Sequence, residues 1–437
     1  MKQMNILKID FCKITGKIKP MHALNNTPTF PGDTYGLFEK IKEARIPYAR
    51  LHDTGGMFGG AHYVDVENIF TDFSADENAP ASYDFAFTDA LLSSMDKIGL
   101  KPFYRLGCTI ENNHKIKAYH IYPPADPHKW ARICEHIIMH YNEGWADGFY
   151  YGIEYWEIWN EPDNAPKIED NPMWKGTQEE FFALYDITSK HLKSRFPDLK
   201  IGGYASCGFY AISDSDFSET AHSTSRVGYF VEFFHDFFRY ISEKKSPLDF
   251  FSWHSYAGLK ENVMYAAYVK EKLTGYGYGA AEVIFNEWNP GIHNRGKAAD
   301  ASNIAAMMCA MQKTPTDMCM YYDGQAHSSY CGLFSGDFHN VFKAYYAFRA
   351  FGELYLQKNE VFSETSAEGV YICAASGDKK TALIVNSNAE SIDITLEAPV
   401  ILQCFATDEK HDFELAEINL NGGILTLPPF AVWLIIF

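Results

Sequence analysis

The stretch that decides the fold is residues 155–162, which read Tyr-Trp-Glu-Ile-Trp-Asn-Glu-Pro. An apolar and aromatic run of this length is typical of a buried strand, and it stops abruptly at Asn-Glu-Pro. Proline lacks a backbone N–H and disfavours helical backbone in the residue before it, so Glu161 is expected where the strand gives way to a loop. A (β/α)8 barrel presents its functional side chains at these strand ends. The stretch therefore predicts such a barrel.

A second stretch repeats the pattern at residues 283–290, which read Val-Ile-Phe-Asn-Glu-Trp-Asn-Pro. Cleavage of a glycosidic bond needs one carboxylic acid that protonates the leaving oxygen and a second carboxylate on the other side of the anomeric carbon. Either glutamate alone would be explained equally well by a structural ion pair. Two strand-end glutamates together, Glu161 and Glu287, favour the carboxylate-pair chemistry.

The rest of the chain supports a barrel followed by a smaller unit. Strand-like segments alternate with helix-like segments, which predicts a parallel, helix-covered barrel over residues 13–355. Beyond this, short β-rich runs are separated by turn dipeptides, which predicts a small antiparallel β-sandwich over 356–437 that residues 1–12 join as a strand. The eight predicted barrel strands are 21–26, 46–51, 101–107, 155–161, 200–204, 248–256, 282–287 and 318–323.

Composition excludes several classes of partner. The 437 residues carry a net charge of −18 without a basic cluster, so neither nucleic acid nor a membrane is an expected partner. The nine cysteines are scattered and lack zinc-like spacing, which indicates reduced thiols of a cytosolic protein. No leader-like apolar segment begins the sequence, so a cytoplasmic location is expected. Composition leaves homo-oligomerisation open.

Other catalytic classes are disfavoured by missing motifs. His136 and His140 share one predicted helix face without a third placed ligand, so surface histidines are expected there and no metal site is predicted. The sequence has no Gly-x-Ser-x-Gly elbow, which disfavours a serine hydrolase. We expect no cofactor.

Residues 159–162 (Trp-Asn-Glu-Pro) and 285–289 (Phe-Asn-Glu-Trp-Asn) resemble the clan A retaining glycoside hydrolases. Within that clan the closest resemblance is to family 39, which contains β-xylosidases and α-L-iduronidases. Residues 50–52 (Arg-Leu-His), residues 253–256 (Trp-His-Ser-Tyr) and the C-terminal β unit support it. The resemblance implies that Glu161 is the acid/base and Glu287 the nucleophile. The loop at residues 53–60 departs from the family pattern, which leaves the sugar undetermined.

Physical roles follow for the neighbours of the two glutamates. Burial is expected to raise the pKa of Glu161, as suits an acid. Asn160 is expected to hydrogen-bond the sugar 2-hydroxyl, an interaction that strengthens in the transition state. Arg50 is expected beside Glu287, where its charge would keep that carboxylate ionised, although an ordinary ion pair explains Arg50 equally well.

Further candidates line the predicted strand ends. Tyr256 and His254 are expected to hydrogen-bond the nucleophile or sugar hydroxyls, against the alternative of a satisfied core histidine. Trp288 is a candidate stacking platform for the sugar, with ordinary packing as its alternative. Three more residues are substrate-binding candidates by position alone: His52, Asp53 and Tyr322.

The sequence therefore predicts a retaining exo-glycosidase that removes a non-reducing-end sugar from an oligosaccharide or glycoside. A β-xylosidase is the first choice. A second hypothesis is the same mechanism on an α-L-arabinopyranoside, galactoside, glucoside or uronide. A third is a non-catalytic carbohydrate-binding barrel, since a fold alone does not fix a function.

Overall fold

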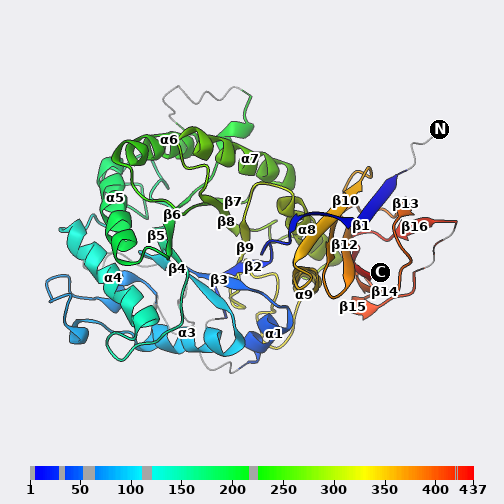
Figure 1. Cartoon of the computed structure of the whole chain (residues 1–437), viewed down its shortest axis with the longest axis horizontal. Coiled ribbons are helices and arrows are strands. Elements are labelled where there is room, and N and C mark those ends of the chain that lie inside the picture. Colours follow the sequence, from blue (N-terminus) through cyan, green and yellow to red (C-terminus); the bar gives the residue numbers. More distant parts are fainter. Residues whose placement is uncertain are drawn as a thin grey trace.

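The protein is described from a computed structural model, which covers residues 5–28, 35–52, 64–110, 121–215, 225–418, 420 and 422–437. Figure 1 shows a barrel ringed by helices on one side and a smaller β unit on the other. The helices α8 and α9 lie between the barrel and the β unit (Figure 1). The predicted fold class, a (β/α)8 barrel with a separate β-sheet unit, is confirmed.

Eight strands close the barrel in chain order, and each is parallel to its neighbours. Because the strands are parallel, all their C-terminal ends meet at one face, where the predicted motifs lie. The strands are β2 (Ala23–Asn25), β3 (Tyr48–Leu51), β4 (Lys101–Leu106), β5 (Tyr155–Ile158), β6 (Lys200–Ser206), β7 (Phe250–Ser255), β8 (Glu282–Trp288) and β9 (Met318–Tyr322).

Helices cover the outside of the barrel, and the start of one of them matches the capping motif in the sequence. The helix α5 starts with a capping box, in which the Thr177 hydroxyl accepts from the Glu180 amide and the Glu180 carboxylate accepts from the Thr177 amide. The helices are α1 (Leu37–Glu43), α2 (Val66–Ile69), α3 (Ala86–Ile98), α4 (Pro127–Glu143), α5 (Gln178–Arg195), α6 (Arg226–Lys244), α7 (Leu259–Gly275), α8 (Ala298–Gln312) and α9 (Lys343–Tyr355).

The barrel interior is built in layers, because alternate residues of each strand point inward. One layer is apolar and aromatic, with Phe103, Tyr155, Phe250 and Ile284 among its members. The residues two positions further along the strands are polar or charged and also buried: Asn25, Arg50, Arg105, Glu157 and Asn286. This polar layer lies directly beneath the C-terminal ends of the barrel strands, the face called here the catalytic face, and supports the candidate site.

The smaller unit is one sheet of nine strands that includes the N-terminal strand, in the order β15-β14-β17-β12-β11-β10-β1-β13-β16. Its pairs are antiparallel except β1 with β13, which is parallel, so the sheet is mixed and not the purely antiparallel one expected. The strand β1 also extends past residue 12, where the sequence placed the boundary. The strands are β1 (Ile6–Lys17), β10 (Asn359–Thr365), β11 (Val370–Ser376), β12 (Lys380–Asn386), β13 (Ile392–Glu397), β14 (Gln403–Thr407), β15 (Asp412–Leu415), β16 (Ile424–Leu427) and β17 (Val432–Ile436).

Alternation along β12 explains how this sheet is held. Leu383 and Val385 point to one face and join the large core shared with the barrel helices. Ala382 and Ile384 point to the other face, where a second core also contains residues of β1. Because residues alternate between the two faces, one face of the sheet packs against the barrel helices and the other face packs into a separate core within the β unit.

Three further expectations concern the cysteines, a membrane-spanning helix and the histidines of α4. All nine cysteines are free and all but Cys12 are buried, as expected for reduced thiols. In the part of the chain that the structure covers, no helix has the length and apolar character needed to span a bilayer. His136 and His140, expected at the surface, are buried instead, with His140 bonded to the Trp145 carbonyl and the Asp89 carboxylate.

Candidate active site

The backbone turns sharply where the first motif leaves β5. Trp159 and Glu161 both have left-handed backbone, with φ of 72° and 48°. Such conformations cost roughly 1–3 kcal/mol each and persist only where the surroundings enforce them. Here the Glu161 amide donates to the Ala205 carbonyl at 3.0 Å, which ties the turn to the end of β6. The turn aims the Glu161 carboxyl into the catalytic face.

Both oxygens of the Glu161 carboxyl have close partners. Oε1 lies 2.8 Å from Nδ1 of His254, which comes from β7. Oε2 accepts a hydrogen bond from the Asn164 amide at 2.7 Å. His254 was expected to hydrogen-bond the nucleophile or sugar hydroxyls. Its Nδ1 instead lies closer to Glu161 Oε1, at 2.8 Å, than to Glu287 Oε2, at 3.6 Å.

Glu287 lies near the end of β8 and is surrounded by donors. The Tyr256 hydroxyl donates to Oε1 at 2.7 Å, as the sequence suggested for this residue. The Asn25 amide donates to Oε2 at 3.1 Å, and Nη1 of Arg50 lies 3.5 Å from the same oxygen. These contacts fix the carboxylate in one orientation and stabilise its charge.

Arg50 is completely buried and links both motifs from below. Its Nε donates to Glu157 at 2.7 Å, and its Nη2 donates to the Asn160 side-chain oxygen at 2.6 Å. Glu157 also accepts from the Asn286 amide at 2.6 Å. Because Arg50 occupies the Asn160 oxygen, the Asn160 amide nitrogen is the atom left to meet a ligand, and no acceptor within the covered ranges bonds to it.

The two glutamates and His254 form one compact group. One side-chain atom from each of Glu161, His254 and Glu287 lies within 4.8 Å of the other two. Such a group could in principle hold a cation. The Arg50 guanidinium beside Glu287 places a positive charge at the same position, which opposes a metal ion there.

The electrostatics of Glu161 differ from the expectation. Burial acts to raise its pKa, but the hydrogen bond and charge of His254, together with the Asn164 amide, lower the pKa below its ordinary value. His254 responds in the opposite sense: burial lowers its pKa, but the charge of Glu287 and the contact with Glu161 raise it. The expectation of a raised Glu161 pKa is therefore wrong: the His254 and Asn164 contacts outweigh the effect of burial.

Glu287 shows the opposite balance. Burial raises its pKa, His254 and Arg50 act to lower it, and the negative charge of Glu161 adds to the increase. The net direction is upward. The pKa values of the two carboxyl groups are thus shifted in opposite directions, and the signs in the free site are the reverse of those usual for an acid at Glu161 and a nucleophile at Glu287.

The remaining predicted residues are not all at the site. Trp288 is 1% exposed and packs against Phe285 and Tyr321, so it is a core residue with no open face for a sugar. His52 is buried, and its backbone carbonyl accepts from the Arg105 guanidinium and the Thr109 hydroxyl. Asp53 lies outside the described residues.

An aromatic rim borders the site on the Glu287 side. Tyr330, in the loop after β9, packs against Tyr256 and Tyr322 with ring centroids 5.9 and 5.4 Å away. Its carbonyl accepts from the Asn289 amide and from the Arg295 guanidinium, both at 2.9 Å, which holds the loop in place. Tyr330 is 42% exposed, so it offers the aromatic face that Trp288 does not.

Several residues at the site were not predicted. Asn164 contacts Glu161, and Asp163 accepts from the Ser206 hydroxyl at 2.8 Å and from the Cys207 amide. Both follow the first motif directly, so their position was the available signal. Nothing in the sequence marks Tyr330, whose place depends on the fold of the loop.

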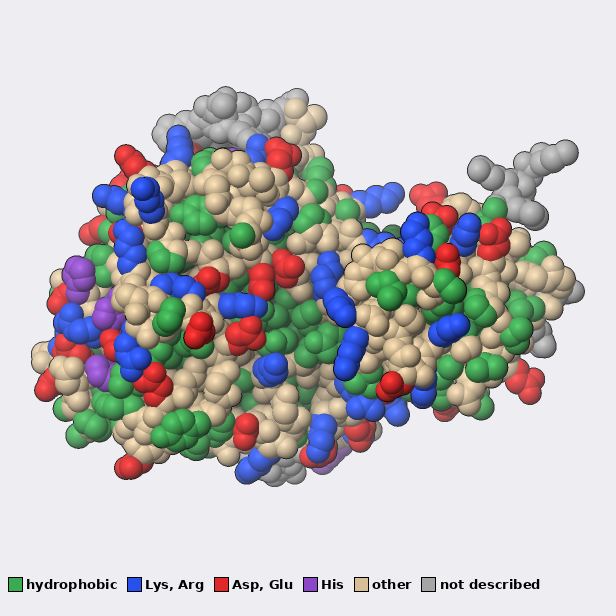
Figure 2. Space-filling model, viewed as in Figure 1, with side chains coloured by type: hydrophobic (Ala, Val, Ile, Leu, Met, Phe, Trp, Pro, Cys, Tyr) green, Lys and Arg blue, Asp and Glu red, His purple; other side chains and the backbone are tan. Residues whose placement is uncertain are grey.

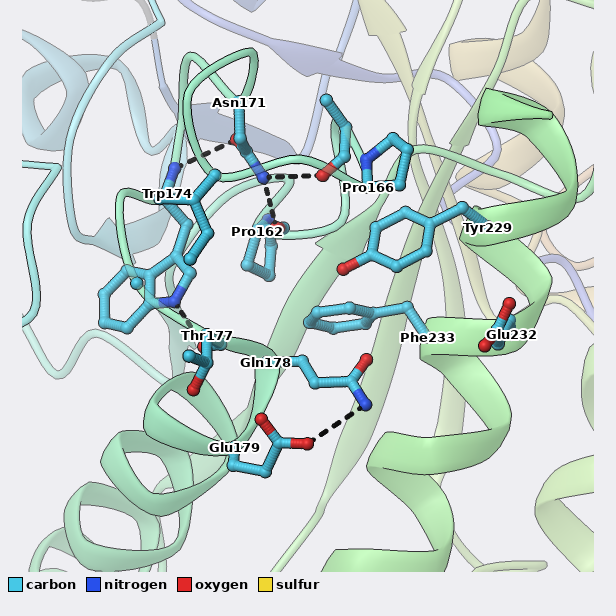
Figure 3. A pocket seen from close by; sticks show the side chains of 13 residues that line it. Pro162, Pro166, Asn171, Trp174, Thr177, Gln178, Glu179, Tyr229, Glu232 and Phe233 are labelled. Atoms are coloured by element: carbon cyan, nitrogen blue, oxygen red, sulfur yellow. Dashed lines mark hydrogen bonds between the residues drawn. The ribbon is translucent and has the colours of Figure 1, made fainter. Parts of the chain in front are cut away.

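A groove of about 520 Å³ lies beside the loop that follows Glu161. Figure 3 shows Tyr229 and Phe233 reaching from α6 toward Pro162 and Pro166 on this loop. Gln178 and Glu179 at the start of α5 form another wall (Figure 3). The outer side of the loop that follows Glu161 therefore lines a solvent-accessible groove.

Charged side chains of both signs lie on the face of the molecule shown in Figure 2. Figure 2 shows acidic and basic side chains interspersed over the visible face, with acidic residues in excess in the whole sequence. A nucleic-acid-binding face gathers basic side chains into one patch.

Comparison with known proteins identifies the family. The family model described as glycosyl hydrolases family 39 matches residues 58–286, which is more than half of the chain. The matched segment contains Glu161 and ends one residue before Glu287.

Two curated relatives are both named β-xylosidase. The protein from Geobacillus stearothermophilus is 27% identical over 204 residues, 44% of this chain and 34% of the relative. The protein from Caldicellulosiruptor saccharolyticus is 28% identical over 134 residues, 28% of this chain and 25% of the relative. The matched segments thus span about a third or less of these relatives.

Solved structures share the fold over nearly the whole chain. A glucosidase from Croceicoccus marinus has a TM-score of 0.76 at 19% identity, covering 99% of this chain and 98% of that one. A family 39 β-xylosidase from Caulobacter crescentus has a TM-score of 0.66 at 16% identity, covering 99% of both chains. With the family match, the shared fold and both glutamate motifs at one face, this chain belongs to glycosyl hydrolase family 39.

Proposed function

We propose that the chain is a retaining exo-glycosidase in which Glu161 is the acid/base and Glu287 the nucleophile. The observation that carries the proposal is the approach of these two carboxyl groups at the C-terminal end of the barrel, where their nearest oxygens lie within 4.8 Å. Carboxyl groups of retaining enzymes stand about 5–5.5 Å apart, whereas inverting enzymes need about 6.5–9.5 Å to admit a water. The short separation favours retention.

In the first step Glu287 attacks the anomeric carbon while Glu161 protonates the leaving oxygen. The Tyr256 hydroxyl and the Asn25 amide hold the attacking carboxylate, and the charge of Arg50 partly offsets the increase in its pKa that burial causes. Protonation of the leaving group requires that the proton of the Glu161–His254 pair reside on Glu161. When a neutral sugar displaces water from the site, a charged Glu161 and a charged His254 become less favourable. Binding of the sugar therefore favours the form in which Glu161 is protonated and His254 is neutral.

In the second step Glu161 acts as a base and activates the water that releases the sugar. Formation of the bond to Glu287 removes a negative charge near Glu161 and His254. Loss of that charge lowers the pKa of Glu161, because a like charge nearby disfavours ionisation. The carboxylate needed for general-base catalysis is thus formed by the preceding step.

A β-xyloside is our first choice of substrate, on the strength of the names of the two curated relatives. A β-glucoside is the second candidate, because the Croceicoccus marinus glucosidase shares the fold over the whole chain. The same two glutamates would also serve an arabinopyranoside, a galactoside or a uronide, and a barrel that binds carbohydrate without catalysis is the competing hypothesis. The cytoplasmic location also stays a prediction.

The test is hydrolysis of a panel of aryl glycosides that includes the β-xyloside, α-L-arabinopyranoside, β-galactoside and β-glucoside. Wild type, Glu161→Ala and Glu287→Ala are compared. We expect cleavage of one glycoside, no activity in Glu287→Ala, and recovery of Glu161→Ala by azide, which replaces the water that needs a base. Binding of a sugar by wild type without cleavage of any glycoside would favour the non-catalytic barrel, and equal cleavage by both variants would exclude the assigned roles.

A further inference from the structure

The segment after Glu161 connects the acid/base to helix α6. The Asn164 amide donates to Glu161 Oε2 at 2.7 Å, and the Asn164 backbone N–H donates to the Glu161 carbonyl at 3.1 Å. On its other side Asn164 meets Arg226, the first residue of α6. The Arg226 Nε donates to the Asn164 carbonyl at 2.6 Å, and its Nη2 donates to the Asn164 side-chain oxygen at 2.7 Å.

These contacts decide which way the Asn164 amide faces. A guanidinium has donors only, so the side-chain atom of Asn164 that faces Arg226 must be the oxygen. The amide nitrogen then faces Glu161, whose ionised carboxylate only accepts. Arg226 is itself held in place, since its guanidinium lies 5.3 Å from the centre of the buried Phe230 ring. Without Arg226, the amide could turn its oxygen toward Glu161.

The orientation of the amide determines where the acid proton resides. Because Oε2 accepts from Asn164, the proton that Glu161 transfers must reside on Oε1, the oxygen that faces His254. We propose that Asn164, with its amide oriented by Arg226, is a positioning residue for Glu161 that fixes the rotation of the carboxyl group and keeps the transferable proton on Oε1. This inference rests on the proposed role of Glu161 as acid/base.

Several charged and titratable groups surround Glu161, and Asn164 is one of several residues that influence its pKa. Asn164 stabilises the ionised form of Glu161, so its loss should raise the pKa of that carboxyl. The other groups that face it are Arg50 from β3, Cys207 after β6, Tyr210 in the following turn, His254 from β7, Tyr256 after β7, Glu287 from β8 and Asp163 on the same loop.

The experiment compares Asn164→Ala, Arg226→Met and the double variant. The control is Arg239→Met, which removes an arginine of the same helix whose ion pair is with Asp236. Each is assayed over pH with a phenyl glycoside, whose leaving group needs an acid, and with a 2,4-dinitrophenyl glycoside, whose leaving group does not. The sugar is the one that the panel identifies.

With the phenyl glycoside, Asn164→Ala should lose about tenfold in kcat/KM, as for loss of one hydrogen bond to a charged group. The basic limb of its pH profile should move to higher pH. Arg226→Met should show a smaller change of the same sign, and the double variant should match Asn164→Ala, because Arg226 acts through Asn164. The loss should shrink with the dinitrophenyl glycoside. An unmoved basic limb, equal losses on both glycosides, or additive effects in the double variant would overturn the proposal.

A second measurement needs no turnover, so it separates this proposal from the proposed function. A carboxyl whose pKa is lowered by folding stabilises the protein above its unfolded pKa, and this contribution is lost as pH falls through the folded pKa. Asn164→Ala should therefore lower the melting temperature more at pH 7 than at pH 3, and Arg239→Met should show a much smaller difference, because its ion pair with Asp236 is exposed. Equal losses at the two pH values would overturn the positioning role even if no glycoside is cleaved.

Discussion

Asp163 makes the folded protein sensitive to pH. Its carboxyl is fully buried, and burial together with the charge of Glu161 raises its pKa from 3.8 to about 7. The groups that face it are Glu161 on its own loop, Tyr204 and Cys207 at the end of β6, and Tyr229 from α6. The unfolded chain releases this proton near pH 3.8 and the folded chain keeps it until about pH 7. Stability therefore falls as pH rises through that window.

The magnitude follows from the gap between the two pKa values. That gap corresponds to about 4 kcal/mol over the whole window, of which about 2.5 kcal/mol is lost between pH 5 and pH 8. In Asp163→Asn the side chain cannot ionise, and its oxygen can still accept from the Ser206 hydroxyl. Relative to wild type, the variant should gain about 2.5 kcal/mol in unfolding free energy on going from pH 5 to pH 8.

Urea unfolding followed by tryptophan fluorescence measures this difference at the two pH values. The control is Asp378→Asn, which makes the same change at an exposed position in the turn between β11 and β12. It should show no change in its difference from wild type between pH 5 and pH 8. If Asp163→Asn and wild type lose stability in parallel over this range, Asp163 does not ionise near neutral pH and the reasoning is refuted.

Three further predictions concern the catalytic face. Tyr256→Phe removes the hydrogen bond to Glu287, so kcat/KM should fall about tenfold or more, and the acidic limb of the pH profile should move to higher pH, because that bond lowers the Glu287 pKa. An unchanged acidic limb would contradict this role. Arg50→Met leaves Glu157 as an unpaired buried carboxylate, which should cost about 3–5 kcal/mol and lower the melting temperature; a variant as stable as wild type would contradict it. Dialysis against EDTA should leave activity unchanged, whereas a loss restored by a divalent cation would indicate a metal requirement.

The fold could be predicted because its signals are local. The apolar runs that end in polar residues correctly predicted all eight barrel strands, and the capping residues Thr177 and Glu180 correctly predicted where α5 begins. The parallel pairing of β1 with β13 could not be predicted, because it joins segments almost 400 residues apart in the sequence. His140 of α4 was misplaced for a similar reason: one of its partners, Asp89, comes from α3.

The candidate site could be predicted only in part. The two glutamates and Tyr256 stand in recognisable motifs, and the structure brings them together. The lowered pKa of Glu161 could not be predicted, because it depends on which carboxylate the His254 ring faces. Likewise Trp288 lies in a motif, but the register of β8 turns its ring into the core, where Phe285 and Tyr321 cover it.

The central claim is that Glu287 forms a covalent bond to the sugar while Glu161 serves as acid and base. The most direct measurement is mass spectrometry of the protein after incubation with a 2-fluoro glycoside that bears a good leaving group, followed by peptide mapping. The account predicts a mass increase of one fluorosugar, located on the peptide that contains Glu287, in wild type and in Glu161→Ala. A label on Glu161, or an active enzyme that releases product of inverted configuration and forms no adduct, would contradict it.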